Sequence, residues 1–291
     1  MKKIVVLSTG MVGSAIAIDL ASQYDVIVAD INEDNLRELS KKHSIKTHIS
    51  DLSIKENVLK LIENCDLVVG AVPGFMGFET LKTVIEASKD IVDISFFPED
   101  AFLLDEPAKE KGVTAIVDCG VAPGMSNVIL GYHNANMEVE KFKCYVGGLP
   151  VQRMLPFQYK APFSPIDVIE EYIRPARFME NGKVVTKPAL SEPELINFDE
   201  IGTLEAFNTD GLRSLLKTMK IPNMKEKTMR YPGHIDYMKM LRETGFFQTE
   251  DINVNGIKIK PINLTSKLLF SKWKLGKNEL EFTAMKIKVA G

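Results

Sequence analysis

The first 120 residues alternate between short runs of β-branched residues and stretches with helical spacing. Apolar residues recur at helical intervals between the runs, as at Ile16 and Leu20 or at Val58 and Ile62. Strands separated by helical segments of about 10–15 residues are typical of βαβ units, and right-handed crossovers then build a doubly wound parallel sheet. The expected strands lie at 4–7, 26–29, 45–50, 67–69, 91–94 and 114–117.

The pattern changes after about Met125. Phe142, Cys144 and Val146 alternate with polar neighbours, which predicts an antiparallel strand with one face in water. Helical spacing returns at 204–219 and at 237–244. We therefore predict an α/β fold over residues 1–122, followed by an α+β domain over residues 123–291. Turns or extended chain are expected around the prolines at 150, 156, 162, 165, 175 and 188.

The final strand pattern changes phase once. Apolar residues alternate in one phase from Leu280 to Ala284 and in the other from Met285 to Val289. Because a one-residue change of phase inside a strand usually marks a β-bulge, we predict a bulge between the two segments.

Composition and charge exclude several classes of protein. The chain has 291 residues, of which 45% are hydrophobic and 26% charged, as in ordinary globular proteins of one or two domains. A net charge of −3 provides no general attraction for nucleic acid or anionic lipid, and no apolar run approaches the ~20 residues that span a bilayer. Three scattered cysteines predict reduced thiols and a cytoplasmic protein. No metal site is predicted, because the histidines at 43, 48, 133 and 234 form no ligand-spaced cluster.

Residues 4–21 have the order strand, tight turn and helix that binds dinucleotides in Rossmann-type domains. The GxGxxG fingerprint falls on Ser8, Gly10 and Gly13, with Thr9, Met11 and Val12 completing the turn. Gly10 lets the backbone approach a pyrophosphate, and Gly13 lets the helix pack on the strand. Ser8 replaces the glycine of the tight turn, where a strained backbone costs about 1–3 kcal/mol. The alternative is a purely structural turn between strand and helix.

An acidic residue closes the next expected strand. Asp30 lies where a carboxylate receives the ribose hydroxyls, and neither it nor Ile31 attracts a 2′-phosphate. NAD is therefore predicted rather than NADP, although Asp30 could instead cap the following helix. Further cofactor contacts are expected after the later strands, at Asp51, Leu52, Ala71, Val72, Pro73, Gly74, Ser95, Val121 and Pro123.

Polar residues also gather in the later stretches of the chain. Asp118 and Ser126 lie in DCGVAPGMSN, after the sixth expected strand. FSPIDVIEEYIRPAR (163–177) crowds charges into one segment, for which a salt-bridged surface helix is the plain alternative. Helix capping is the alternative for Thr209 and Asp210. Arg230 and His234 occupy a Pro-Gly turn, where the alternative for His234 is an inert, exposed side chain.

Together these stretches resemble the saccharopine dehydrogenase superfamily, and most closely its lysine 6-dehydrogenase branch. The resemblance is carried over essentially the whole chain by VGAVPGFMGF, DCGVAPGMSN, YVGGLP, FSPIDVIEEYIRPAR, EAFNTDGLRSLL and RYPGHIDYMKMLRETGFF. It implies NAD-dependent oxidation of the ε-amino carbon of L-lysine to allysine, which cyclises to 1-piperideine-6-carboxylate. It also implies a Rossmann domain, a substrate-binding α+β domain and a homodimer.

The sequence departs from this family pattern at identifiable positions. Ser8 replaces the first fingerprint glycine. Thr209 stands in Asn208-Thr209-Asp210, where saccharopine-forming relatives tend to have arginine, and this difference favours a lysine-sized substrate. Family members also continue past the strand ending at Gly291, so we expect a closing segment to be missing here.

The implied reaction requires a cation for the α-carboxylate, an anion for the α-ammonium and a general base. Arg174 or Arg230 could hold the carboxylate. His234 is the first candidate for the base, through a pKa near neutrality, and Tyr159 is the second. The ammonium could be held by Asp118, Glu205 or Asp210, with Asp118 also a candidate catalytic residue and Asn208 and Thr209 beside them in the substrate site.

Two other functions remain open from the sequence. One is reductive condensation of an aldehyde with an amine, as in the formation of saccharopine or carboxynorspermidine. The other is a non-catalytic NAD-binding relative, which the substitution at Ser8 and the missing closing segment would favour.

Overall fold

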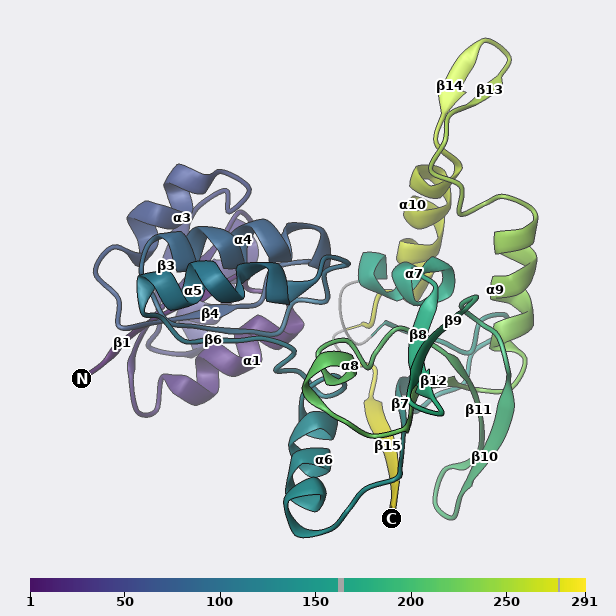
Figure 1. Ribbon diagram of the computed structural model, residues 1–291. Coiled ribbons are helices and arrows are strands. Elements are labelled where there is room, and N and C mark those ends of the chain that lie inside the picture. Colours follow the sequence, from purple (N-terminus) through teal and green to yellow (C-terminus); the bar gives the residue numbers. More distant parts are fainter. Residues whose placement is uncertain (162–164, 277) are drawn as a thin grey trace. The chain divides into compact units, whose positions relative to one another are not determined.

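The computed structural model describes residues 1–161, 165–276 and 278–291, and the chain divides into two compact units (Figure 1). The first unit is Met1–Gly124 and the second is Met125–Gly291. The ranges expected from the sequence were 1–122 and 123–291. The roles assigned to the two ranges stay predictions.

The first unit contains a parallel sheet in the order β3-β2-β1-β4-β5-β6. This order confirms the doubly wound Rossmann-type fold, because the chain reverses direction across the sheet between β1 and β4. The strands are β1 (Lys3–Leu7), β2 (Asp25–Asp30), β3 (Lys46–Ile49), β4 (Leu67–Gly70), β5 (Ile91–Asp93) and β6 (Ala115–Ile116).

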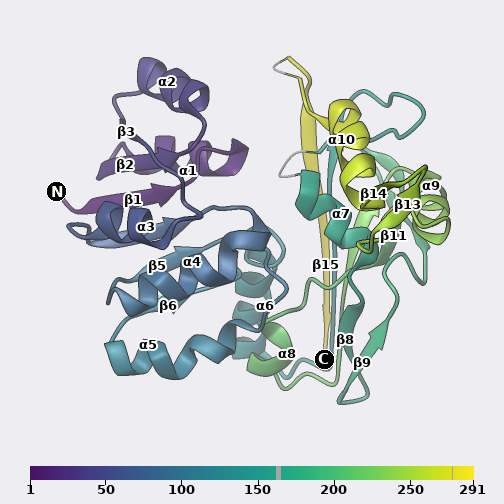
Figure 2. The ribbon, with the colours of Figure 1, turned by 90° about the horizontal axis from the view of Figure 1, so that it is seen from above.

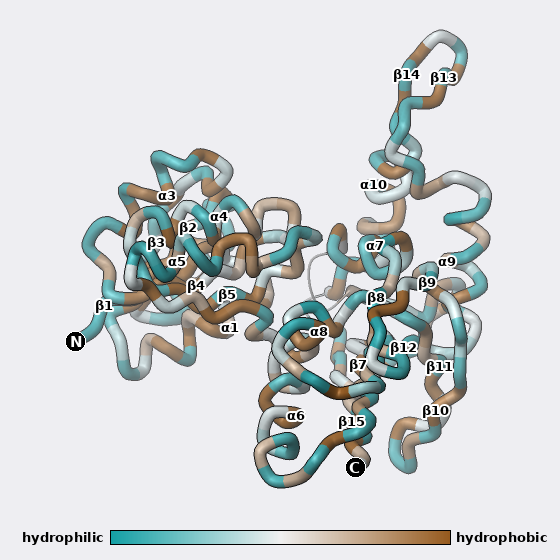
Figure 3. The backbone as a smooth tube through the Cα atoms, viewed as in Figure 1, coloured by the Kyte–Doolittle hydropathy of each residue, from teal (hydrophilic) through white to brown (hydrophobic). Residues whose placement is uncertain are grey.

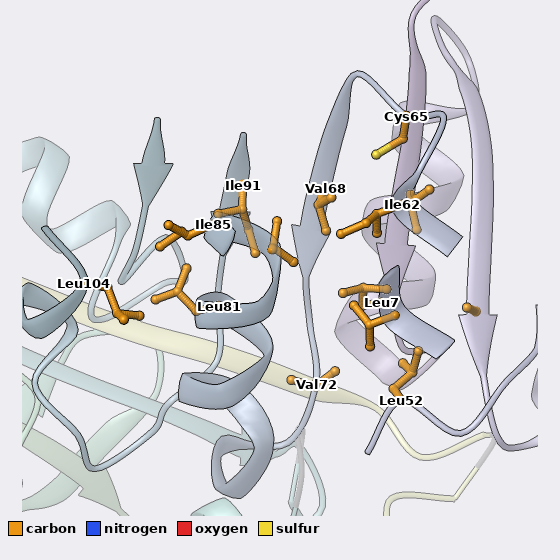
Figure 4. Packing of buried hydrophobic residues seen from close by; sticks show 14 of the residues in the cluster. Leu7, Leu52, Ile62, Cys65, Val68, Val72, Leu81, Ile85, Ile91 and Leu104 are labelled. Atoms are coloured by element: carbon orange, nitrogen blue, oxygen red, sulfur yellow. The ribbon is translucent and has the colours of Figure 1, made fainter. Parts of the chain in front are cut away.

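Both faces of this sheet are buried. Along β1, Val5 and Leu7 belong to one apolar cluster (Figure 4), whereas Ile4 and Val6 belong to another. Burial on both faces explains why β1 is an unbroken apolar run, drawn in brown in Figure 3. The covering helices are α1 (Met11–Leu20), α2 (Glu33–Lys42), α3 (Lys55–Ile62), α4 (Gly74–Glu86), the 3₁₀ turn η1 (Ala101–Leu104) and α5 (Asp105–Lys111).

The second unit contains a mixed sheet in the order β10-β11-β12-β7-β15, with β8 pairing with β12 and with β9. β7 pairs parallel with β12 and antiparallel with β15, so the antiparallel strand predicted there is only half right. Its expected wet face is present only at the start of the strand, where Lys141 is exposed and Lys143 is half-buried, whereas Tyr145 on the same face is buried. The strands are β7 (Lys141–Pro150), β8 (Ala176–Glu180), β9 (Lys183–Lys187), β10 (Glu194–Phe198), β11 (Gly202–Asn208), β12 (Asn223–Arg230) and β15 (Glu281–Ala290).

Helices pack on one face of this sheet, around Phe207 of β11. α7 lies beside both α9 and α10 (Figure 2). Pro165 begins α7 rather than a turn, as proline can at the first turn of a helix, while residues 162–164 lie outside the described part of the chain. The helices are α6 (Met125–Asn136), α7 (Pro165–Ile173), α8 (Leu215–Thr218), α9 (His234–Glu243) and α10 (Pro261–Trp273), with a separate hairpin of β13 (Ile252–Val254) and β14 (Ile257–Ile259).

Two further predictions for this unit differ from the structure. Of the segment 204–219 predicted as helical, only 215–218 form a helix, α8, and residues 204–208 belong to strand β11. The period of two in β11 is hidden because Leu204 and Phe207 are buried in clusters on opposite faces. The predicted bulge is absent from the described strand β15, which pairs with β7 in unbroken register. The change of phase arises because the two faces of β15 have different neighbours. Phe282 and Ala284 pack on the cluster around Tyr145, whereas helix α6 also packs against β15 and explains the apolar residues of the second phase, from Met285 to Val289. Within the described residues, no helix has both the length and the hydropathy to cross a membrane.

Candidate functional site

The turn between β1 and α1 has the backbone that the fingerprint predicts. Ser8 has a φ of 96°, in the region that favours glycine, so the expected strain at this residue is confirmed. A Cβ on Gly13 would lie 2.3 Å from the Ser8 carbonyl oxygen, which makes glycine necessary there. Gly10 precedes α1, and the first N–H groups of that helix can receive an anion.

The carboxylate of Asp30 holds this turn in place. Its Oδ2 accepts hydrogen bonds from the Thr9 backbone N–H at 2.6 Å and the Ser8 hydroxyl at 3.1 Å. Its Oδ1 accepts one from the Asn32 N–H at 2.8 Å. The cap of α2 is Asn32, whose side chain accepts from the Asn35 N–H. The alternative of Asp30 as a simple helix cap is therefore wrong.

A cavity of about 310 Å³ adjoins the turn, between α1 and α2. Thr9 is 3% exposed, and its hydroxyl has no hydrogen-bond partner among the described residues. The residues that α2 contributes to this cavity were not predicted, although their helical spacing places them on one face of the helix. The lining consists of Thr9, Gly10, Met11, Ser14, Ile18, Asn35, Glu38, Leu39, Lys42 and His43.

The other expected cofactor residues follow the carboxyl ends of the strands, but several have structural partners. Leu52 and Val72 are buried in the apolar cluster of Figure 4. Ser95 is buried, and its N–H and hydroxyl both donate to Asp93. Asp51 accepts hydrogen bonds from Ser53, which lower the pKa of its carboxyl. Ala71, Pro73 and Gly74 lead from β4 into α4, while Val12, Ile31 and Val121 are exposed and Pro123 is buried.

Asp118 lies just after β6 and is 6% exposed. Its φ of 54° places a non-glycine residue in the left-handed region, where strained residues often mark functional sites. The edge of the sheet formed by the carboxyl ends of the strands is where open α/β sheets bind ligands.

In the second unit the structure brings Tyr159, Arg230 and His234 together. The guanidinium of Arg230 lies 4.4 Å from the Tyr159 ring centre and forms a salt bridge with Glu171. It also donates to the hydroxyls of Tyr159 and Tyr172 and to the Met229 carbonyl. At 1% exposure, Arg230 has its donors engaged inside the unit rather than presented to a ligand.

His234 is completely buried rather than exposed. Its Nε2 lies 2.9 Å from the Tyr172 hydroxyl, and its Nδ1 lies 2.8 Å from the Phe157 carbonyl oxygen. Because a carbonyl only accepts, Nδ1 carries the proton and Nε2 accepts from Tyr172. Burial and the charge of Arg230 lower the pKa of His234 to about 3. The expectation of a near-neutral pKa is therefore wrong.

The remaining substrate-site candidates lie in separate polar clusters. Asp210 binds the Arg177 side chain through both oxygens, at 2.9 and 2.7 Å, instead of capping a helix. The hydroxyl of Thr209 lies 3.0 Å from that of Thr228. Arg174 forms the expected i,i+4 ion pair with Glu170 at 3.3 Å, but its side chain is mostly buried rather than on a helix surface. Elsewhere, Asn208 donates to Ser191 and Glu192, and Glu205 accepts from the Gly233 N–H.

Glu171, Tyr172 and Arg177 were not predicted as site residues, although all three stand in the polar segment 163–177. In the structure Glu171 pairs with Arg230, the Tyr172 hydroxyl contacts His234, and Arg177 binds Asp210. No group of three or more metal-ligating side chains occurs among the residues that the structure describes.

Comparison with known proteins gives matches to family models along nearly the whole chain. Residues 4–116 match the model for the saccharopine dehydrogenase NADP binding domain, and residues 120–291 match that for the saccharopine dehydrogenase C-terminal domain. Among solved structures, apo saccharopine dehydrogenase (L-Glu forming) from Saccharomyces cerevisiae superposes with a TM-score of 0.73 at 18% identity. That match covers 99% of this chain and 81% of the yeast chain, and it shows a shared fold.

Three curated relatives are between 22% and 26% identical to this chain. Saccharopine dehydrogenase [NADP(+), L-glutamate-forming] from S. cerevisiae is 24% identical over 90% of this chain and 61% of its own length. Carboxyaminopropylagmatine dehydrogenase from Synechocystis sp. is 22% identical over 96% of this chain and 75% of its own. Alpha-aminoadipic semialdehyde synthase from Arabidopsis thaliana is 26% identical over 77% of this chain, which spans 23% of that protein.

Proposed function

The chain belongs to the saccharopine dehydrogenase family, and from this premise we propose that it is a nicotinamide-dependent oxidoreductase acting on a carbon–nitrogen bond of an amino acid. The observation that carries the proposal is the β1–α1 turn. Gly13 packs against Ser8, the N-terminus of α1 is open to an anion, and Asp30 closes the neighbouring strand.

The residues of this turn fit a dinucleotide. The N–H groups at the start of α1 would hold the pyrophosphate, beside the hydroxyl of Thr9, which has no hydrogen-bond partner in the described part of the chain. When bound, the nicotinamide would accept a hydride from the substrate. Asp30 retains lone pairs for a ribose hydroxyl and would repel a 2′-phosphate, so we propose NAD rather than NADP.

For the substrate we propose L-lysine, oxidised at its ε-amino carbon. Thr209, which stands in place of the arginine of saccharopine-forming relatives, is buried against Thr228 and adds no cation for a second amino acid. Arg174 is the candidate for the α-carboxylate, because its ion pair with Glu170 is long, at 3.3 Å, whereas Arg230 is fully buried and engaged by both Glu171 and two tyrosine hydroxyls. Glu205 and Asp210 remain candidates for the α-ammonium.

A proton must leave the ε-ammonium before hydride transfer, because a protonated amine has no lone pair to stabilise the forming C=N bond. We propose Asp118 as the acceptor of this proton, on account of its place after β6 and its strained backbone. His234 and Tyr159 become positioning residues, since burial lowers the pKa of His234 to about 3 and raises that of Tyr159.

Cleavage of saccharopine to glutamate and the semialdehyde is the second candidate, favoured by the names of several curated relatives. The discriminating experiment follows the absorbance of the reduced nicotinamide with L-lysine, saccharopine, ornithine and diamines as donors. We expect lysine with NAD to give the highest kcat/KM. A higher value with saccharopine would assign the second function, and no reduction with any donor would contradict both.

A further inference from the structure

One face of the second unit's sheet carries a concentration of lysines. On this face β12, β7 and β15 place lysines in register, so that Lys143 lies directly opposite both Lys225 and Lys288. Like charges directly opposite one another on a sheet are destabilising. The arrangement stands out in a chain whose net charge is −3. We call this the lysine face, consisting of Lys141, Lys143, Lys225, Lys227, Lys286 and Lys288.

Some of these lysines have evident structural roles. Lys225 binds Glu192 at 2.8 Å, and Lys227 binds Glu194 at 2.7 Å. Lys286 and Lys288 lie on β15, at the edge of the sheet, where lysine commonly prevents pairing with another chain.

These roles do not extend to Lys141 and Lys143. Both lie on β7, an interior strand between β12 and β15. Neither forms an ion pair within the described part of the chain. Glu194, which lies near enough for Lys143 to lower the pKa of its carboxyl, is already bound to Lys227. Among the described residues, Lys141 and Lys143 therefore have no counter-ion, and Lys143 lies directly opposite a third lysine, Lys225.

These lysines line a groove of about 330 Å³ at the start of β7 and β12. Asn223 also lines it; its side-chain oxygen accepts from the Asn181 N–H, which leaves its NH₂ group as a donor. The groove contains one carboxylate, Glu180, which lies 3.4 Å from Lys225. Its volume is that of a small-molecule site, and its free groups are cations and N–H donors.

We propose that this groove binds a small, multiply charged anion of the phosphate class, held by Lys141, Lys143 and Lys225 with the amide of Asn223. The bound anion would neutralise the ladder of opposed lysines and thereby stabilise the second unit. This site is built from residues outside the candidate functional site and does not depend on the proposed function.

The test measures binding of inorganic pyrophosphate and inorganic phosphate by calorimetry, together with the thermal unfolding of the second unit. The single tryptophan of the chain, Trp273, is buried in that unit and reports its unfolding by fluorescence. We expect pyrophosphate to bind and to raise the melting temperature more than sodium chloride at equal ionic strength. In Lys141→Gln/Lys143→Gln, Kd should weaken by about tenfold or more, because charge-assisted hydrogen bonds are lost.

The matched control is Lys258→Gln/Lys260→Gln, which removes two exposed lysines in and beside β14 of the same unit and should leave binding unchanged. An equal Kd in wild type and in the β7 variant would overturn the proposal, because binding at the dinucleotide turn would then account for the whole signal. An equal effect of sodium chloride would also overturn it. If only a glutamate-rich peptide bound the lysine face, an acidic protein would replace the small anion.

Discussion

Replacing His234 by Asn should remove a specific pH dependence of folding. In the folded second unit His234 is buried, accepts a hydrogen bond from Tyr172 and has a pKa of about 3. In the unfolded chain its pKa returns to about 6.5. The folded state therefore binds fewer protons than the unfolded state between these two values. Stability is lost as the pH falls through 6.5, and the loss continues toward 3.

The size of the effect follows from the two pKa values. Between pH 7 and pH 5 the unfolded histidine goes from about one quarter to almost fully protonated, while the folded one stays neutral. The linkage relation then gives a loss of about 2 kcal/mol in the free energy of unfolding over this range. The Asn side chain can still donate to the Phe157 carbonyl, and it does not titrate.

The assay is urea unfolding followed by Trp273 fluorescence at pH 7, 6 and 5. Trp273 lies beside His234, with ring centres 6.3 Å apart, so the signal reports this core. His234→Asn is expected to be less stable at pH 7 and to lose about 2 kcal/mol less than wild type on acidification. His133→Asn, on α6 of the same unit, is the control and should keep the wild-type slope. Equal slopes for wild type and His234→Asn would refute the assignment of a buried, neutral His234.

Four other outcomes follow from the structure. Ser8→Gly should be more stable than Ser8→Ala by about 1 kcal/mol in calorimetry, because both variants lose the hydroxyl contact with Asp30 and only glycine relieves the positive φ; equal stabilities of the two variants would contradict the strain. Asp30→Ala should lower the preference for NAD over NADP in kcat/KM at least about tenfold, with Asp25→Asn, at the other end of the same strand, as the control; an unchanged ratio would remove Asp30 from cofactor choice. Asp118→Asn should lower kcat about 100-fold or more with little change in NAD affinity, and an unchanged kcat would exclude it as the proton acceptor. Iodoacetamide should label the exposed Cys119 well before Cys144, since burial raises the pKa of the Cys144 thiol, and mass spectrometry would reveal the reverse order.

The first unit could be predicted from sequence in most respects because its signals are local. The central strands β1, β2 and β4 are short apolar runs rich in β-branched residues and buried on both faces, and the fingerprint fixes the turn at Ser8 and Gly13 directly. What the sequence could not provide was the engagement of Asp30 by the turn, since that contact joins residues 21 and 22 positions apart.

The second unit was less predictable because its patterns depend on distant partners. β11 looks helical in sequence, since Leu204 and Phe207 are buried on opposite faces of the sheet. His234 was expected to titrate near neutrality, but its environment is built by Phe157, Tyr172 and Arg230, which lie far from it in sequence or on another element. Residue type alone predicts a histidine pKa near 6.5, whereas burial among distant residues lowers it far below that value.

The central claim, a nicotinamide-dependent oxidation of an amino-acid C–N bond, is tested most directly by steady-state assay of the purified chain. With NAD and L-lysine, absorbance at the wavelength of the reduced nicotinamide should rise, and the cyclic imine product should accumulate in equal amount. The Asp118→Asn variant should lose this activity while still binding NAD. Binding of NAD without reduction by lysine, saccharopine, ornithine or any diamine would contradict the account.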